Sequence, residues 1–461
     1  YNQRQKALVT LDKVLEQDET FGIGMNGEIS AVTFGLYAQE DITAADGSVI
    51  PADGLLEIVS VNENGQAVCS TDLPFGSFYL KELSTDSHYL LNGETFPFTF
   101  EYGGPSVAVV EISANDGEAV TNELIRGEIK GLKTDENGTG LGGAVIGLFK
   151  SDETEFTAEN ALATTTSADD GSFSFTNVPY GDWVLKELDS PEGFILSDEV
   201  IPVTVEEDGQ VVEISLANER VYGDLRLTKV DKDYPDNKLT GAEFEVYRDT
   251  NGNKELDEGD ELLGKLEETS TGIYEMSHIL YGGVFVRETK APEGFLLDEN
   301  AYYVEITENG KIYEVENEAG IGFTNMAQTG SLRIEKTSSD GKVEGFSFRV
   351  TGANGYDQTF KTDKNGEIFI EGLRVGDYTV SEVSDGASAN YVLPADKKVT
   401  ILADKTTVAQ MHNELRDTPK TGDDSKPWLW AALMGVSAMG AAALGVAAYV
   451  GKRKKDNHTA K

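Results

Sequence analysis

Four glutamates occupy positions that a β-strand would turn into a hydrophobic core. Glu288 follows Val284 and Val286 at alternate positions, so the strand face that carries the two valines also carries a carboxylate. The same phase recurs three more times, and the four residues are Glu82, Glu187, Glu288 and Glu382. Because burial disfavours the ionised form of a carboxyl group, each of these glutamates is a candidate proton carrier.

Each glutamate lies between a lysine and an asparagine that have the same inward phase. Lys229 ends an alternating strand in phase with Leu225 and Leu227, and Asn325 ends another strand in phase with Phe323. Polar residues often emerge into solvent at strand ends, but here the order and the phase are kept four times. The sets in chain order are Lys13, Glu82 and Asn122; Lys133, Glu187 and Asn218; Lys229, Glu288 and Asn325; Lys336, Glu382 and Asn413.

A buried set of this kind permits one specific reaction. Burial disfavours the lysine ammonium, and a neutral lysine amine is a nucleophile. A protonated glutamate can donate a hydrogen bond to the asparagine carbonyl, polarise it, and pass its proton to the departing ammonia. The product is a Lys–Asn isopeptide bond that forms once, with the effective molarity supplied by the folded core. This is self-modification, and we do not expect an enzyme that turns over.

The elements that would position these sets are β-strands. Alternating segments are separated by turn sequences such as DENG at 135–138 and DKNG at 363–366, and no long helical periodicity occurs before Pro427. The sets recur at intervals of about 100 residues, the size of one β-sandwich domain. The sequence therefore predicts an all-β chain of tandem immunoglobulin-like or prealbumin-like sandwiches.

Composition excludes several classes of protein. Across 461 residues the formal net charge is −43, which makes nucleic acid a poor partner. The single cysteine, Cys69, excludes an intramolecular disulfide, and we expect it to be buried in a strand. The chain starts at Tyr1 in strand-like sequence with no signal peptide, so we interpret it as the C-terminal part of a longer protein.

The glutamate segments carry a family resemblance. ETKAPEGF at 288–295 and ELDSPEGF at 187–194 resemble the E-box of collagen-adhesin B-type domains and of the prealbumin-like domains of SpaA-type Gram-positive pilins. The resemblance extends to Leu415 and implies a Lys–Asn bond between the first and last strands of each domain, with the glutamate as catalyst. The predicted domains are repeat 1 (1–124), repeat 2 (125–220), repeat 3 (221–327) and repeat 4 (328–415).

Two points stay open in this prediction. Repeats 1 and 4 lack the Pro-x-Gly that follows the glutamate in the other two, so whether they form their bonds is undecided. In repeat 2 Gly131 fills an apolar position of the first strand, which leaves Lys130 as a rival to Lys133.

Repeat 3 also contains a candidate calcium loop. Oxygen-bearing side chains stand at the first, third, fifth, ninth and twelfth positions of a twelve-residue segment, as in a calcium-binding loop. Lys254 replaces the usual glycine at the sixth position, and an acidic hairpin loop is the alternative. The candidate ligands are Asp249, Asn251, Asn253, Asp257 and Asp260.

The C-terminus has three parts in a fixed order. Residues 416–427 contain TPKTG and a polar spacer, 428–450 are apolar and long enough for a transmembrane helix, and 451–461 form a basic tail expected on the cytoplasmic side. This order resembles a sortase sorting signal of the LPXTG type, with threonine in place of leucine. The resemblance implies cleavage between Thr421 and Gly422. The motif residues are Thr418, Pro419, Lys420, Thr421 and Gly422.

Together these features predict a secreted protein that spans the membrane transiently and is then anchored covalently to a Gram-positive cell wall. It would be the stalk of an adhesin or pilus-associated protein, with sortase, peptidoglycan or a pilus base as partners and a host or matrix ligand bound upstream. One alternative is a polymerising pilin, for which the nearest motif is DKDYPDNK at 231–238. Another is a surface enzyme whose catalytic domain precedes residue 1.

Overall fold

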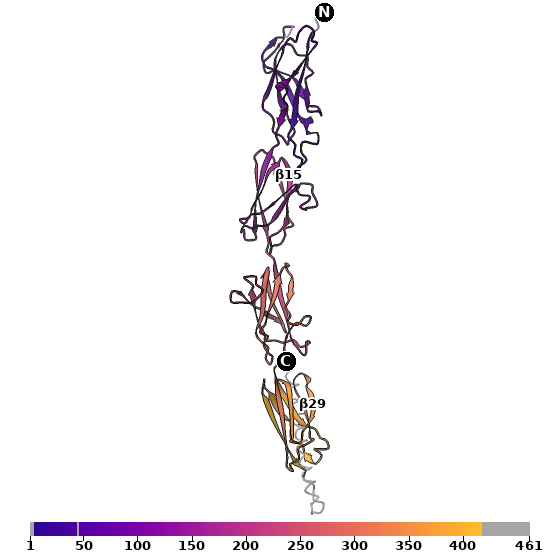
Figure 1. The fold of residues 1–461 in the computed structure, drawn as a ribbon, viewed down its shortest axis with the longest axis vertical. Helices are drawn as coiled ribbons and strands as arrows, with labels where there is room; N and C mark the ends of the chain where they lie inside the picture. Colours follow the sequence, from indigo (N-terminus) through magenta and orange to yellow (C-terminus); the bar gives the residue numbers. More distant parts are fainter. Residues whose placement is uncertain (1–3, 44–45, 417–461) are drawn as a thin grey trace, which may run out of the picture. The chain divides into compact units, whose positions relative to one another are not determined.

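The computed structural model describes residues 4–43 and 46–416, and strands make up most of what it describes (Figure 1). In these residues the helices are three short 3-10 turns, η1 (Glu28–Ala31), η2 (Ala114–Gly117) and η3 (Ala353–Gly355). The chain forms two compact units, which are described separately. The first holds Tyr1–Pro292 and Leu297–Asn325, and the second holds Glu293–Leu296 and the residues from Met326 onward.

Repeat 1, in the first unit, is built from two principal sheets. One has the order β10-β1-β6, with β9 also paired to β1; the other has the order β5-β2-β7-β8, and β3 pairs with β4 separately. The strands are β1 (Lys6–Leu15), β2 (Thr33–Ala38), β3 (Ile42–Thr43), β4 (Val49–Ile50), β5 (Leu55–Ser60), β6 (Gln66–Val68), β7 (Gly76–Ser84), β8 (Thr95–Phe100), β9 (Val109–Ser113) and β10 (Val120–Asn122). Alternation explains the faces: in β8, Phe96, Phe98 and Phe100 are buried and the residues between them are exposed.

Repeat 2 repeats this arrangement with fewer strands. Its sheets have the orders β14-β11-β17 and β13-β12-β15-β16. The strands are β11 (Arg126–Asp135), β12 (Val145–Lys150), β13 (Ala163–Thr166), β14 (Ser172–Pro179), β15 (Gly181–Asp189), β16 (Val200–Val205) and β17 (Val211–Asn218). Its core contains Ile129, Ile146, Phe173 and Leu185, which come from both sheets. The two sheets are therefore the two layers of a sandwich.

Repeat 3 completes the first unit. Its sheets have the orders β21-β22-β18-β25, with β26 also paired to β18, and β20-β19-β23-β24. The strands are β18 (Tyr222–Asp231), β19 (Glu243–Arg248), β20 (Glu261–Lys265), β21 (Glu267–Ser270), β22 (Ile273–Leu280), β23 (Gly282–Lys290), β24 (Ala301–Ile306), β25 (Ile312–Glu314) and β26 (Phe323–Asn325). The final strand is thus split in two, as it is in repeat 1, whereas repeat 2 ends on one continuous strand.

Repeat 4, in the second unit, has sheets of the orders β30-β27-β34-β32 and β29-β28-β31-β33. The strands are β27 (Thr329–Ser338), β28 (Ser347–Thr351), β29 (Asp357–Lys361), β30 (Glu367–Arg374), β31 (Gly376–Glu382), β32 (Tyr391–Val392), β33 (Lys397–Ile401) and β34 (Thr406–Leu415). The predicted DKNG turn lies between β29 and β30, where Gly366 has φ +82°. This is the left-handed conformation that glycine adopts most readily.

The all-β prediction is confirmed by these sandwiches. Each repeat has its own cluster of buried apolar side chains. Within residues 4–43 and 46–416, no helix is both long and apolar enough to cross a membrane. The predicted span at 428–450 lies outside the described residues, as do the predicted sorting motif and basic tail.

Candidate functional site

In every repeat the lysine and the asparagine lie on adjacent parallel strands of one sheet. The first strand carries the lysine in its second half, and the last strand carries the asparagine at or near its end. The register is the same each time, because the lysine pairs with the residue two positions before the asparagine. The lysine partners are Val120, Leu216, Phe323 and Met411. Since side chains two apart share a strand face, each lysine and asparagine are diagonal neighbours on the inner face.

The glutamate comes from the opposite sheet. Glu82, Glu187, Glu288 and Glu382 lie on β7, β15, β23 and β31, in each case across from an apolar residue of the neighbouring strand. In repeats 1, 2 and 3 the register shifts immediately beside that pair, as at Glu243/Phe244 next to Glu288. Such irregularities redirect a side chain, and they are frequent at functional sites.

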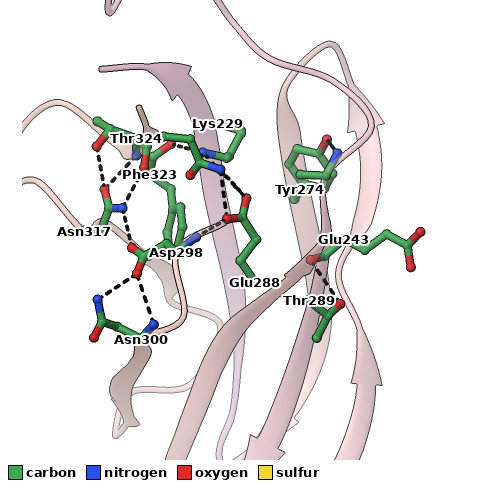
Figure 2. Close-up of polar contacts among 12 residues, drawn as sticks. Lys229, Glu243, Tyr274, Glu288, Thr289, Asp298, Asn300, Asn317, Phe323 and Thr324 are labelled. Atoms are coloured by element: carbon green, nitrogen blue, oxygen red, sulfur yellow. Dashed lines mark hydrogen bonds and ion pairs between the residues drawn. The ribbon is translucent and has the colours of Figure 1, made fainter. Parts of the chain in front are cut away.

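The three side chains meet in the buried interior between the two sheets. In repeat 3 the Lys229 Nζ donates to Asn325 Oδ1 at 2.5 Å, and the Asn325 amide donates to the two carboxylate oxygens of Glu288 at 3.0 and 2.9 Å. Figure 2 shows Lys229 and Glu288 facing each other, with Nζ 3.8 Å from Glu288 Oε1. All three side chains are almost completely buried.

Repeats 1 and 2 have the same arrangement. Lys13 donates to Asn122 at 2.6 Å, and Lys133 donates to Asn218. The amide groups of these asparagines donate to their glutamates at 2.8 Å. The lysine nitrogens lie 3.9 and 3.2 Å from the carboxylates of Glu82 and Glu187. The structure therefore brings together all three residues predicted for each of these repeats.

Burial shifts the ionisation of the three lysines and of Glu288 toward the neutral forms. It lowers the pKa of Lys13 and of Lys229 to about 8, although Glu82 and Glu288 oppose the shift. Burial likewise lowers the pKa of Lys133 and raises the pKa of Glu288. A neutral amine and a protonated carboxyl group are the forms that the predicted reaction requires.

One feature of the geometry differs from the predicted chemistry. The sequence suggested that the glutamate would bind the asparagine carbonyl, but the structure places each carboxylate against the amide nitrogen. The carbonyl oxygen faces the lysine instead. This orientation suits the glutamate to deliver a proton to the leaving nitrogen. Of the two predicted roles, polarising the carbonyl and protonating the departing ammonia, it favours the second.

A backbone N–H group that the sequence did not predict also contacts the glutamate in three of the repeats. In repeats 1, 2 and 3 the residue ten positions after the glutamate donates its N–H to the carboxylate, at 2.7, 2.9 and 2.9 Å. These residues are Asn92, Ser197 and Asp298, and the side chain of each accepts an N–H two residues further on. Asn, Ser and Asp favour such turns, so their recurrence ten positions after each glutamate could have predicted this contact from the sequence.

Repeat 4 has a looser site. Asn413 donates to Glu382 at 2.6 Å, but the Lys336 ammonium donates to the backbone carbonyl of Thr337 and lies 4.3 Å from the centre of the Phe346 ring. Glu382 Oε2 and Asn413 Oδ1 are buried without a hydrogen-bond partner. The position ten residues after Glu382 is Val392, which pairs with β34 in the sheet instead.

In repeat 2 the structure separates the two rival lysines. The Lys133 side chain is 0% exposed and reaches Glu187, whereas the Lys130 side chain is 54% exposed and pairs with Glu128. Gly131 interrupts the apolar phase because the Phe173 ring takes its space. A Cβ at this position would lie 2.0 Å from Phe173 Cζ.

The side chains of the segment predicted to bind calcium form hydrogen bonds within the loop. Asn251 and Asn253 turn their amide nitrogens, not their oxygens, toward Asp257 at 3.0 and 2.9 Å. The oxygens of Asp249 and Asp260 accept backbone N–H groups of the loop. Among the residues that the structure describes, no three His, Cys, Asp or Glu side chains are grouped to hold a metal ion. The segment is an acidic loop closed by its own hydrogen bonds, and calcium binding there stays a prediction.

Tandem β-sandwiches with first and last strands in parallel define a class, the proteins built of prealbumin-like domains. The comparison with protein families agrees: the model of the SpaA prealbumin-like fold domain matches residues 127–220, 223–319 and 330–415. These stretches cover more than half of the chain, so the chain belongs to this family. Repeat 1 lies outside them. No curated protein matches the chain.

Solved structures resemble the chain at low sequence identity. The TIE protein of Bacillus anthracis is 20% identical. The match covers 88% of this chain and 74% of the TIE chain, with a TM-score of 0.52. The major pilin subunit BcpA of Bacillus cereus is 14% identical over 63% of this chain and 100% of its own, with a TM-score of 0.31. A streptococcal ancillary pilin is 17% identical over 70% of this chain and 99% of its own, with a TM-score of 0.26. At this identity the match to the TIE protein supports the fold alone.

Proposed function

We propose that the chain is a self-crosslinking stalk of a surface adhesin or a pilus-associated protein. The observation that carries the proposal is the contact of three buried groups in repeats 1, 2 and 3. There the lysine nitrogen reaches the asparagine carboxamide while the glutamate contacts the nitrogen that would leave. A buried ion pair of this kind adds little to stability by itself, because desolvation opposes the attraction. A chemical role accounts for its repetition better than a structural one.

The proposed reaction conserves atoms and charge. Lysine first transfers a proton to the glutamate, and burial favours this neutral pair. The lysine nitrogen then attacks the asparagine Cγ, the glutamate gives its proton to the amide nitrogen, and the carboxylate so formed takes the second proton from the lysine nitrogen. The C–N bond to the lysine forms, the Cγ–Nδ2 bond breaks, and ammonia leaves. Each bond would join the first and last strands of its repeat.

The stalk would be attached to the wall through the C-terminal signal. A sortase would cleave between Thr421 and Gly422 and join Thr421 to an amine of peptidoglycan or of a pilus base. The apolar segment 428–450 would hold the precursor in the membrane until then.

Mass spectrometry of the purified full chain tests the crosslinking. Each bond removes one ammonia from the sequence mass, and digestion should yield branched peptides that join Lys13 to Asn122, Lys133 to Asn218 and Lys229 to Asn325. Glu288→Ala and Lys229→Ala should each restore one ammonia in repeat 3 only. A chain of full sequence mass after long incubation in the folded state would refute the proposal.

A further inference from the structure

The reacting asparagine of repeat 3 stands on a short strand, as that of repeat 1 does. β26 (Phe323–Asn325) pairs with β18 over three residues only, whereas Asn218 of repeat 2 ends a strand paired over eight. Strand β25 ends at Glu314, and the eight residues of segment 315–322 separate it from β26. A three-residue strand attached on one side needs further contacts to hold its side chains in one place.

Asn317, in the segment between β25 and β26, supplies these further contacts. Its side-chain oxygen accepts the backbone N–H of Thr324 at 2.7 Å, and its side-chain nitrogen donates to the Thr324 carbonyl at 2.8 Å. Thr324 Oγ1 also donates to it, at 3.2 Å. One amide side chain therefore forms the two bonds that a neighbouring strand would form. It does so at the residue directly before Asn325, so it fixes the backbone from which the reacting carboxamide projects.

Asp298 joins this contact to the glutamate. Its carboxylate Oδ2 accepts the Asn317 amide at 2.9 Å and the Tyr302 hydroxyl at 2.7 Å. Its backbone N–H donates to Glu288 Oε2 at 2.9 Å. Figure 2 shows the resulting series, from Glu288 through Asp298 and Asn317 to Thr324. The two reacting partners of Lys229 are thus held by one continuous set of hydrogen bonds.

We infer that Asp298 and Asn317 are positioning residues for bond formation in repeat 3, acting through the Glu288 carboxylate and the Asn325 backbone. The inference depends on the proposed crosslinking and adds to it a pair specific to this repeat. Bond formation needs the lysine nitrogen in line with the asparagine Cγ, and small displacements of reacting groups slow such reactions steeply. The pair substitutes for the continuous strand that positions Asn218 in repeat 2.

The charge of Asp298 gives the pair a second effect. The charged groups that act on Glu288 are Lys229 and Asp298; those that act on Lys229 are Glu288, Asp298 and Asp231. Asp298 raises the pKa of Glu288, in addition to the larger effect of burial, and it opposes the lowering of the Lys229 pKa by burial. Burial would raise the pKa of Asp298 itself, but hydrogen bonds from Asn317, Tyr302 and Asn300 together outweigh it and keep that pKa below its usual value. Asp298 is therefore charged when the reaction occurs.

The test is a time course of bond formation in the full chain. The chain is made by cell-free synthesis, portions are quenched in denaturant, and the fraction of crosslinked Lys229–Asn325 peptide is measured by mass spectrometry. The Lys133–Asn218 bond in the same molecules is the internal control. Asn317→Ala should slow the repeat 3 bond by about ten- to a hundredfold and leave the repeat 2 bond unchanged.

Asn300→Ala is the matched control variant. Asn300 also donates to Asp298, at 2.7 Å, but it is exposed and lies on the side away from Thr324 in Figure 2. This variant should form the repeat 3 bond at nearly the wild-type rate. An equal effect of Asn300→Ala and Asn317→Ala, or no effect of Asn317→Ala, would overturn the inference.

Asp298→Asn separates positioning from a general loss of structure. It keeps the backbone N–H and the size of the side chain but removes the charge, so the pKa values of Glu288 and Lys229 should both fall. The pH profile of the repeat 3 rate should then move to lower pH, while that of repeat 2 stays in place. A repeat 3 rate that falls equally at every pH, without a shift of the pH profile, would assign Asp298 a structural role alone. A wild-type chain without any crosslink would instead refute the proposed function, and normal wild-type bonds with unaffected variants would refute this inference only.

Discussion

Lys336 of repeat 4 donates to the carbonyl of its neighbour Thr337 at 2.5 Å. The oxygen of Asn413 that the lysine reaches in the other repeats has no hydrogen-bond partner here. Glu382 has also lost the backbone donor that fixes Glu82, Glu187 and Glu288. The residues of the set are all present in repeat 4, but their side chains are not arranged for reaction.

We therefore expect repeat 4 to form its bond more slowly than the other three. Lys336 must first rotate away from Thr337, and Glu382 lacks the N–H that fixes its orientation, so positioning is poorer. In a time course of the full chain, the peptide joining Lys336 to Asn413 should appear last or stay incomplete. Equal rates in all four repeats would show that the arrangement of Lys336 does not limit the reaction.

The rate in repeat 3 should depend on pH with a maximum. Below the raised pKa of Glu288 the carboxyl group is already protonated, so a further fall in pH only reduces the neutral fraction of Lys229. Above about pH 8, the pKa of Lys229, the amine is already neutral, and a further rise only deprotonates Glu288. The rate of the Lys229–Asn325 bond should fall on both sides. A rate that kept rising above pH 9 would mean that Glu288 carries no proton in the reaction.

An uncrosslinked repeat 3 should become more stable at alkaline pH. In Asn325→Ala, Lys229 and Glu288 remain but no bond can form. Because the pKa of Lys229 is lowered from 10.5 to about 8, the unfolded chain binds more protons between these values and stability rises with pH across that window. Repeat 3 should therefore resist chemical denaturation better at pH 10 than at pH 8, as followed by hydrogen exchange of β18 and β23. The opposite trend would contradict the lowered pKa.

Repeat 2 offers a matched pair of lysines. Lys133→Ala should abolish the bond to Asn218 and with it the stabilisation from closing that loop, about 4–5 kcal/mol in the chain-entropy model developed for disulfides. Lys130→Ala removes an exposed charge and should keep both the bond and the stability, because surface pairs contribute about 0–1 kcal/mol. Digestion and mass spectrometry of the two variants, with thermal unfolding, distinguish them. Loss of the bond in Lys130→Ala would reassign the nucleophile.

Strand phase predicted the candidate sets because burial of a polar residue among apolar ones is a property of the residue pattern. The sandwich layers and the opposition of Glu288 to Lys229 follow from the same pattern. The prediction was weakest at Gly131, where a glycine takes the place of an apolar residue. The space that it leaves is filled by Phe173, which is 42 residues away in sequence and reaches it across the sheet. Such compensation is visible only once strands β11 and β14 are paired.

Two other features depended on side-chain direction and on the backbone. The spacing of Asp249, Asn251 and Asn253 matched a calcium loop, but spacing does not say whether an amide turns its oxygen or its nitrogen inward. The N–H of Asp298 belongs to the backbone, and its contact with Glu288 is set by the path of the loop after β23. Residue type gave a hint only through the recurrence of Asn92, Ser197 and Asp298.

The final prediction is mechanical. Lys229 and Asn325 are 96 residues apart and lie near the two ends of repeat 3, on adjacent strands that run parallel. A bond between them would carry force directly from the first strand to the last. Closing a loop of this length would stabilise the repeat by about 4–5 kcal/mol in the chain-entropy model developed for disulfides. Under tension the effect of the bond should be greater still. Hydrogen bonds between strands separate one after another, whereas a covalent amide stays intact.

Single-molecule pulling on the full chain should therefore show almost no extension of the segment between Lys229 and Asn325. Glu288→Ala cannot form the bond and should release that segment as one additional step, while the steps of repeats 1, 2 and 4 stay as they were. Lys130→Ala, which leaves every proposed bond intact, is the control for substitution itself. If wild-type repeat 3 unravels to its full contour length, force passes through its hydrogen bonds, and the chain is not a covalently reinforced stalk.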